Sequence, residues 1–198
     1  MLRTFLALIL FGAISQLQSQ DIAIQFYQGV AKPMVSYKPD GISLAYKVKF
    51  DSDTRLGITA GDLNKLSFSL LLGASNVSAT HSSNDIISTF THSSLLIDVP
   101  IRYALNESPI TSIAVGPSFG LLVASSQTTN GLPVRSESIF TPINFSMLTE
   151  LAFAGYSSEN LNIYPYFCYR MMLNSADNDG DNLRLNCLSF GLRMDILR

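Results

Sequence analysis

The charged side chains of this chain recur at every second position of segments whose other positions are apolar. Within residues 95–103, Asp98 and Arg102 alternate with Ile97 and Ile101. Side chains of a β-strand point alternately to its two faces, so these charges share one face. The same parity collects five cations and three anions, namely Lys47, Lys49, Asp98, Arg102, Glu150, Arg170, Arg193 and Asp195.

Charges on the inner face of a closed sheet must be paired, because an uncompensated buried charge is costly. We therefore predict that these eight residues form an ion-pair network that fills the inside of a small barrel. The alternative is a narrow or gated ion path that uses the two surplus cations.

Both histidines stand two residues before a serine, in a link rich in Ser and Thr. The pairs are His81 with Ser83 and His92 with Ser94. A serine nucleophile needs a base within hydrogen-bond reach, and this spacing would suit a lipid-modifying barrel enzyme. Serine is so frequent here that solvated loop histidines are the favoured interpretation, and we predict no enzymatic activity.

Cys168 and Cys187 share the inward parity on two consecutive predicted strands. A hairpin centred on Asn178 would place them opposite each other, at a distance that permits a disulfide. The alternative is a pair of small apolar fillers with free thiols.

Acidic residues alternate in Asp177-Asn-Asp-Gly-Asp-Asn182, as they do in calcium-binding loops. However, Asn182 and Leu188 stand where an EF-hand requires Gly and a bidentate Glu. We predict an acidic hairpin tip, with no metal site and no cofactor; the alternative is a loop that binds calcium weakly.

Eight segments of alternating polarity predict the strands that position these residues. They are 22–28, 42–50, 66–75, 95–104, 110–124, 143–154, 161–173 and 185–196. The segment Arg55–Gly61 also alternates, and counting it as a separate strand would give an odd number of strands. Bacterial membrane barrels have even strand numbers, so we merge this segment with the third strand through a bulge at Gly61-Asp62. The links 76–94, 125–142 and 174–184 are long, whereas Asn106–Pro109 and Ser157–Asn160 are short turns. The pattern predicts an all-β fold, an eight-stranded antiparallel up-and-down transmembrane β-barrel with long external loops.

Composition agrees with a membrane barrel. Charged residues make up 14% of the 198 residues, and the net charge of −2, without a basic cluster, argues against a nucleic-acid partner. The mean hydropathy of +0.25 suits a chain in which every second strand residue meets lipid. Residues 1–19 have the basic start, apolar run and polar end of a signal peptide, so 20–198 would be the barrel domain.

Three segments carry a family resemblance. They are Leu95-Leu-Ile-Asp-Val-Pro-Ile-Arg-Tyr103, Ile113-Ala-Val-Gly-Pro-Ser-Phe-Gly-Leu-Leu122 and Leu188-Ser-Phe-Gly-Leu-Arg-Met-Asp195. They resemble the fourth, fifth and closing strands of the porin-like outer-membrane β-barrel family of Bacteroidetes-type bacteria, over roughly residues 41–196. The resemblance implies a barrel in the outer membrane and no particular reaction. The chain ends in Ile196-Leu-Arg198, whereas such barrels usually end in an aromatic residue.

From these observations we expect a protein of the cell outer membrane with a packed polar interior. Its role would be structural, adhesive or accessory to secretion, exerted through external loops or membrane partners, and its surroundings would be the lipid bilayer. The alternatives are a small porin-like channel for solutes or ions, a lipid-modifying barrel enzyme, and a secreted soluble barrel of the lipocalin type with its apolar face inside.

Overall fold

The computed structural model describes residues 21–36, 45–83, 86–105, 109–134, 140–176 and 183–197. The predicted signal peptide and the acidic segment Asp177–Asn182 lie outside the described residues. No helix among the described residues is long and apolar enough to cross a membrane.

Eight antiparallel strands close into a barrel. In the order of pairing they are β1 (Asp21–Ser36), β3 (Asp51–Gly61), β4 (Leu66–Ser83), β5 (Ile86–Asp98) with its continuation β6 (Ile101–Ala104), β7 (Ile110–Thr129), β9 (Ile143–Phe153), β11 (Leu161–Met172) and β12 (Arg184–Leu197). The last strand pairs with the first, from Ala23 opposite Leu197 to Ser36 opposite Arg184, and this ladder closes the ring. The predicted all-β fold, an eight-stranded antiparallel up-and-down barrel, is confirmed.

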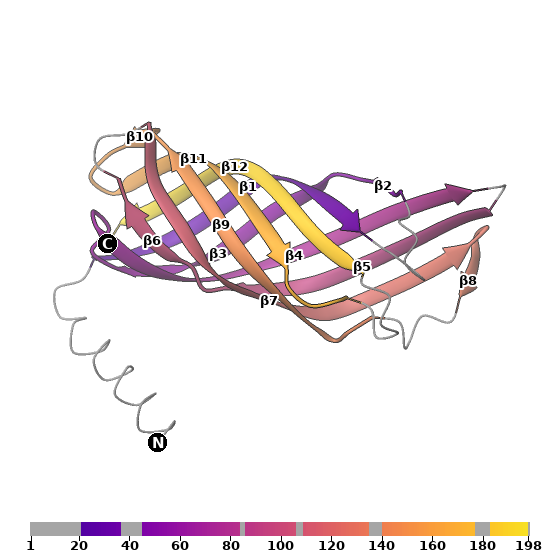
Figure 1. Cartoon of the computed structure of the whole chain (residues 1–198). Helices are drawn as coiled ribbons and strands as arrows, with labels where there is room; N and C mark the ends of the chain where they lie inside the picture. Colours follow the sequence, from indigo (N-terminus) through magenta and orange to yellow (C-terminus); the bar gives the residue numbers. More distant parts are fainter. Residues whose placement is uncertain are drawn as a thin grey trace, which may run out of the picture.

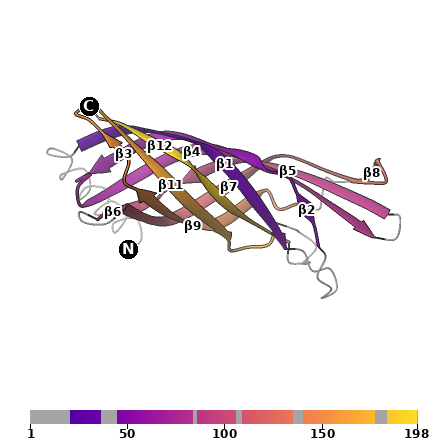
Figure 2. The same ribbon diagram turned by 90° about the horizontal axis from the view of Figure 1, so that it is seen from above.

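The two ends of the barrel differ (Figures 1 and 2). Both ends of the described chain lie at one end, together with Leu105 after β6, Pro109 before β7, and the connections 62–65 and 154–160, the second of which includes β10 (Tyr156–Ser157). We call this the turn end. The connections at the opposite, loop end contain β2 (Lys47–Val48) and β8 (Leu132–Val134).

The predicted second strand is wrong, although the number of barrel strands is right. The second strand is β3, which contains the segment Arg55–Gly61, and Leu56 lies opposite Leu72 of β4. Gly61 ends β3 with φ +132°, a conformation that favours glycine, and a turn follows where we expected a bulge. Of the predicted strand 42–50, the structure describes 45–50, and only the short β2 is extended there.

The outer face of β4, β5, β6 and β7 changes abruptly from apolar to polar. Residues paired across these neighbouring strands form rows, and the rows nearest the turn end are apolar. They run from Leu66–Tyr103–Ile113 at the turn end, through Leu72–Ile97–Phe119, to Ala74–Leu95–Leu121. The next rows are Asn76–Ser93–Ala124, Ser78–Thr91–Ser126 and Thr80–Thr89–Thr128. We call the apolar rows the belt; their eight steps along β4 span about 26 Å at ~3.3 Å a residue.

The strands continue far beyond the belt. Residues 76–83, 86–93 and 122–129, with β2 and β8 at the two edges, form a sheet that projects from the barrel (Figure 1). We call this sheet the extension. The predicted long loops 76–94 and 125–142 are thus strand over much of their length, because Ser and Thr are compatible with strands.

An apolar cluster lies between the extension and the loop-end mouth of the barrel. Its buried members are Val77, Ala79, Phe90, Phe140, Met172, Ala176, Leu183 and Leu185. Tyr46 packs edge-on against Phe90 at 5.5 Å between ring centroids, and burial raises the pKa of this phenol, which lies outside the barrel strands. The cluster covers the mouth of the barrel with side chains.

Candidate functional site: the barrel interior

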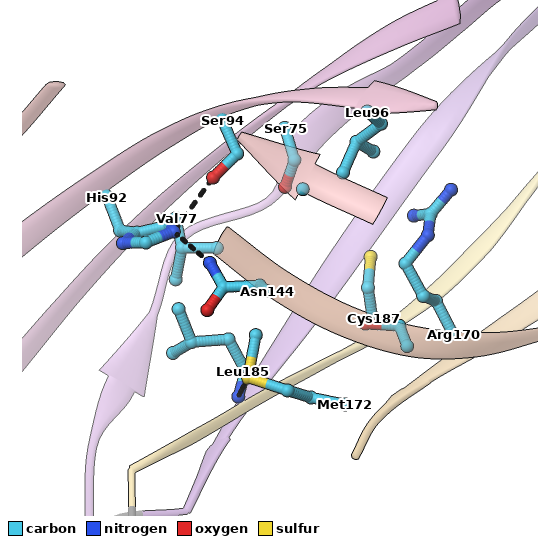
Figure 3. Close-up of a pocket in the computed structure, with 12 residues that line it drawn as sticks. Ser75, Val77, His92, Ser94, Leu96, Asn144, Arg170, Met172, Leu185 and Cys187 are labelled. Atoms are coloured by element: carbon cyan, nitrogen blue, oxygen red, sulfur yellow. Dashed lines mark hydrogen bonds between the residues drawn. The ribbon is translucent and has the colours of Figure 1, made fainter. Parts of the chain in front are cut away.

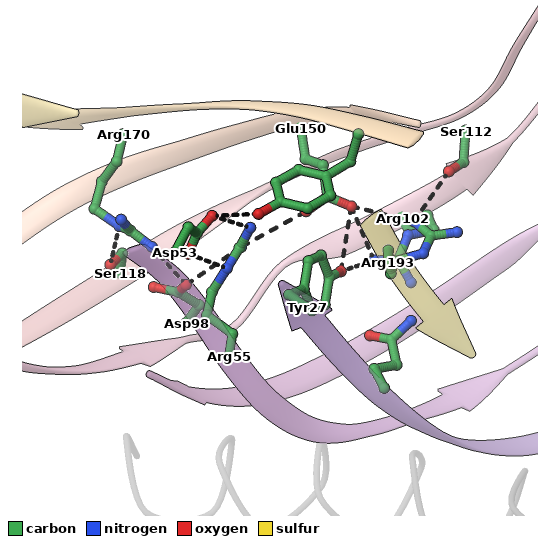
Figure 4. Close-up of polar contacts among 12 residues, drawn as sticks. Tyr27, Asp53, Arg55, Asp98, Arg102, Ser112, Ser118, Glu150, Arg170 and Arg193 are labelled. Carbon is green, nitrogen blue, oxygen red and sulfur yellow. Dashed lines mark hydrogen bonds and ion pairs between the residues drawn. The ribbon is translucent and has the colours of Figure 1, made fainter. Parts of the chain in front are cut away.

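A network of ion pairs crosses the middle of the barrel (Figure 4). Near the loop end, Arg170 of β11 donates from Nη2 to Asp98 at 2.7 Å and from Nε to Ser118 at 3.0 Å. Arg55 of β3 lies 3.6 Å from the same Asp98 and forms two hydrogen bonds of 3.0 Å to Asp53. Such bidentate contacts are among the strongest charge-assisted hydrogen bonds in proteins.

Glu150 of β9 is the centre of the network. Its carboxylate lies 3.1 Å from Arg193, 3.3 Å from Arg102 and 3.6 Å from Arg55, and it accepts a hydrogen bond of 3.2 Å from the hydroxyl of Tyr27. Only 1% of Glu150 is exposed. A single carboxylate therefore compensates three guanidinium groups contributed by different strands.

Aromatic rings hold the central arginine. The Arg55 guanidinium lies 4.2 Å from the ring centroid of Tyr27 and 5.3 Å from that of Tyr166. The hydroxyl of Tyr166 donates to Asp53 at 2.7 Å. With buried Leu71 and Leu148, these rings fill the space that the ion pairs leave. Tight filling of this kind is expected inside a barrel of eight strands.

The predicted interior set is correct for six of its eight members. Asp98, Arg102, Glu150, Arg170, Arg193 and Asp195 are all buried inside the barrel. Lys47 and Lys49 are exposed, because their segment is not a barrel strand, so placing them inside was wrong.

The members that we missed are Asp53 and Arg55 of β3. If this segment is treated as a strand, Asp53 and Arg55 fall on the face opposite to the apolar residues Leu56 and Ile58, and the sequence alone could have placed them inside. The buried network thus contains four arginines and four carboxylates, and its formal charge is zero. The ion-path alternative depended on two surplus cations inside the barrel, and this balanced network has none.

The cysteines are not directly opposite each other. Cys168 lies opposite Ser189, and Cys187 lies opposite Arg170, so the register differs by two residues from the predicted one. Both residues are buried and both thiols are free. The interpretation as small fillers fits this arrangement, and the predicted direct pair is wrong.

His92 and Ser94 do meet, but inside the protein (Figure 3). The Ser94 hydroxyl lies 2.8 Å from His92 Nε2, and the Asn144 amide lies 3.2 Å from the same nitrogen. In a nucleophilic triad an acidic group binds the histidine nitrogen that does not face the serine, and so orients the ring. Here that nitrogen is His92 Nδ1, which has no hydrogen-bond partner among the described residues, so the pair lacks the third member of a triad. The adjoining cavity of about 30 Å³ has room for little more than a water molecule. His81 is placed elsewhere, with its Nδ1 2.8 Å from the carbonyl of Ala45.

A metal site is not apparent in the part of the chain that the structure describes. No group of three His, Cys, Asp or Glu side chains there is arranged to hold an ion. Buried acidic residues point to arginines, as the contacts of Asp53 and Asp98 show.

Comparison with known proteins gives a structural likeness only. No protein-family model matches the chain, and no curated protein matches it. The outer membrane protein OprG from Pseudomonas aeruginosa is 15% identical, with a TM-score of 0.44 over 90% of this chain and 95% of that chain. The attachment invasion locus protein Ail of Yersinia pestis, in complex with the heparin analogue sucrose octasulfate, is 14% identical, with a TM-score of 0.43 over 89% of this chain and 99% of that chain.

Neisserial surface protein A is 17% identical, with a TM-score of 0.34 over 88% of this chain and 95% of that chain. At this level of similarity, conclusions about function must come from the residues of this chain.

Proposed function

We propose that this chain is an outer-membrane protein whose closed barrel anchors the extension at the cell surface. The extension would act there by contact, in a structural or adhesive role or as an accessory to secretion. The single observation that carries the proposal is the sharp boundary between the belt and the hydroxyl-rich rows of the extension.

The belt and the apolar outer faces of the other barrel strands support placement in a membrane. Ile58, Leu70 and Phe190 lie on the outer face with 54%, 47% and 54% of their surface exposed, on three different barrel strands. An outward apolar band of about 25 Å is typical of transmembrane barrels, and the length of the belt agrees with it once strand tilt is allowed for. A soluble lipocalin-like barrel would instead face these side chains inward.

The filled interior supports an anchoring role over a channel. The network around Glu150 occupies the middle of the barrel, and the apolar cluster with Phe90 and Phe140 covers the loop-end mouth. Ion passage would need the ion pairs to separate in a medium of low dielectric constant, which is costly. We propose no enzymatic activity, because His92 and Ser94 are buried beside a cavity too small for a lipid.

The extension supports a role in contact. Its outer rows carry Ser and Thr hydroxyls across three strands, among them Thr91, which lies 2.7 Å from Ser126. Hydroxyls give a polar sheet face with donors and acceptors for a polar partner. The Bacteroidetes-type assignment and the signal peptide belong to the same proposal, on the sequence features given above.

A shortened hairpin separates anchoring from contact. Ser78 lies opposite Thr91, so residues 79–90 can be replaced by an Asn-Gly turn that keeps the ladder below this pair. We expect the variant to remain in the membrane fraction after a carbonate wash but to lose the adhesion or aggregation that cells making the complete chain show. Recovery of the complete chain in the soluble fraction would overturn the membrane placement, and unchanged adhesion would overturn the contact role.

The channel alternative has its own measurement. In planar bilayers we expect no steady conductance from the purified chain. A steady conductance that changes on substitution of Arg102 or Arg170 would show an open path and refute the filled interior.

A further inference from the structure

The exposed charges of the described chain are divided by sign between the two ends of the barrel. At the turn end they are the acids Asp21, Asp62 and Glu159 and the single cation Lys65. Lys65 forms an ion pair of 3.8 Å with Asp62, the one ion pair that a lysine makes in the described part of the chain. At the loop end the exposed charges that the structure describes are all cations, namely Lys32, Lys47, Lys49 and Arg184.

Three of these cations accompany one exposed aromatic ring. The ammonium group of Lys32 in β1 lies 5.8 Å from the ring centroid of Phe50, and 64% of Phe50 is exposed. Lys49 precedes Phe50 in the chain, and Lys47 of β2 lies two residues before Lys49. We call these three lysines and Phe50 the cationic patch.

The cationic patch faces away from the protein and is not neutralised by the acids that the structure describes. Tyr46 and Val48 pack against the apolar cluster at the mouth of the barrel. Side chains of an extended segment alternate between its two faces, so the lysines of this segment point away from the cluster. The acid nearest to them along the chain is Asp51, and its carboxylate accepts a hydrogen bond of 2.7 Å from the backbone N–H of Asn76.

The cationic patch lies where the apolar outer surface ends. On the outer face of β1, Lys32 follows Val30, which is 40% exposed and pairs with Phe190 of β12. The backbone N–H of Lys49 donates at 3.2 Å to the carbonyl of Ser78, in the second polar row beyond the belt. Aromatic side chains gather at the level where lipid headgroups begin, and lysines near an anionic membrane surface are attracted to it.

We propose that the cationic patch binds the phosphate group of an anionic lipid headgroup in the leaflet at the loop end. The compact charge of an ammonium group suits a phosphate, and Phe50 lies at the level of the headgroup. Each lysine close to such a headgroup strengthens binding by about fivefold. Binding fixes the depth of the barrel in the bilayer and keeps the extension outside it. This inference rests on the proposed membrane placement, but it does not depend on the contact role of the extension.

The test compares two lipids by native mass spectrometry of the complete, folded chain released from detergent micelles. Phosphatidic acid and phosphatidylcholine with the same acyl chains are titrated separately, so that only the headgroup differs. We expect the first phosphatidic acid to bind at least about tenfold more tightly than the first phosphatidylcholine. In the double variant Lys32→Gln with Lys49→Gln this preference should disappear, because two lysines at about fivefold each account for it. The control Lys65→Gln, at an exposed position of the turn end, should keep it.

The outcomes separate a lipid site from a site for free anions. Equal binding of the two lipids by the unaltered chain overturns the proposal, as does an unchanged preference in the double variant. Ammonium phosphate in molar excess should not displace phosphatidic acid, because the acyl chains also hold the lipid, and complete displacement would overturn the lipid assignment. Both substituted lysines are exposed, and if the double variant does not fold, the comparison of the two lipids on the unaltered chain decides.

The carbonate wash tests the membrane placement on its own. Recovery of the complete chain in the soluble fraction would refute the placement and the lipid site together. Retention in the membrane fraction with equal binding of the two lipids would refute the lipid site alone.

Discussion

Replacing Glu150 by glutamine removes the shared charge at the centre of the network while keeping the shape of the side chain. Three arginines, at 3.1, 3.3 and 3.6 Å, then lose their common counter-ion. With an effective dielectric constant of about 20, each pair corresponds to roughly 5 kcal/mol of gross Coulomb attraction. Most of this is offset, because the variant no longer pays the desolvation of a buried carboxylate. Removing one partner of a buried ion pair typically costs about 3–5 kcal/mol, and we expect a loss of unfolding free energy in this range.

The measurement is urea unfolding of the chain in phospholipid bilayers, followed by circular dichroism because the chain has no tryptophan. The matched control is Glu159→Gln, at an exposed position in a turn-end connection, for which we expect a change within about 0.5 kcal/mol. The double variant Glu150→Gln with Arg102→Met restores neutrality and should recover at least about 1 kcal/mol of the loss.

A loss below about 1 kcal/mol for Glu150→Gln, or one equal to that of Glu159→Gln, would show that Glu150 is not the main counter-charge of the three arginines, because water or an ion would then compensate them. Failure of the double variant to recover stability would show that charge balance is not what Glu150 supplies.

Three further predictions test the outer face, the packing and the thiols. Leu70→Lys, on the outer face of the belt, should lower the unfolding free energy of the bilayer-embedded chain by about 2–4 kcal/mol. The control Leu132→Lys, in β8 outside the belt, should change this free energy by less than about 0.5 kcal/mol. Equal effects of the two substitutions would contradict the membrane placement. Gly57→Ala should cost about 1–3 kcal/mol, because a Cβ there would clash with the backbone carbonyl oxygen of Leu70. Gly120→Ala, where the nearest atom to the new Cβ is at 3.5 Å, should cost less than about 1 kcal/mol in the same urea titration. Both cysteines should resist maleimide in the folded chain and react fully after unfolding without reductant, as mass spectrometry would show, and a protected pair in the unfolded chain would reveal a disulfide.

Much of the two-sided architecture was predictable from alternation. Leu95 to Tyr103 sorts into apolar and polar positions by parity, and the structure places Asp98 and Arg102 inside and Ile101 outside. The prediction required no knowledge of which strands are neighbours, because the two faces of a strand are a local property of the backbone.

The second strand was missed for a local reason. Residues 42–50 alternate at least as well as Arg55–Gly61, and parity cannot say which of two alternating segments enters a barrel. Pairing decides this, because Leu56 finds Leu72 of β4 across a short turn and Phe26 of β1 on its other side. The four-residue connection 62–65 favours this hairpin over one with the more distant segment.

Alternation along the chain was enough to predict a barrel of strands with charges on one face and apolar side chains on the other. The closed barrel was needed to show which acids meet which arginines, that the four arginines and four carboxylates of the interior balance, and that Cys168 lies opposite Ser189. Parity repeats every two residues along one strand, whereas register depends on which distant strands pair and where each connection ends. The cluster around Glu150 draws on β1, β3, β6, β9 and β12, so its composition could not be known until the ring of strands was closed.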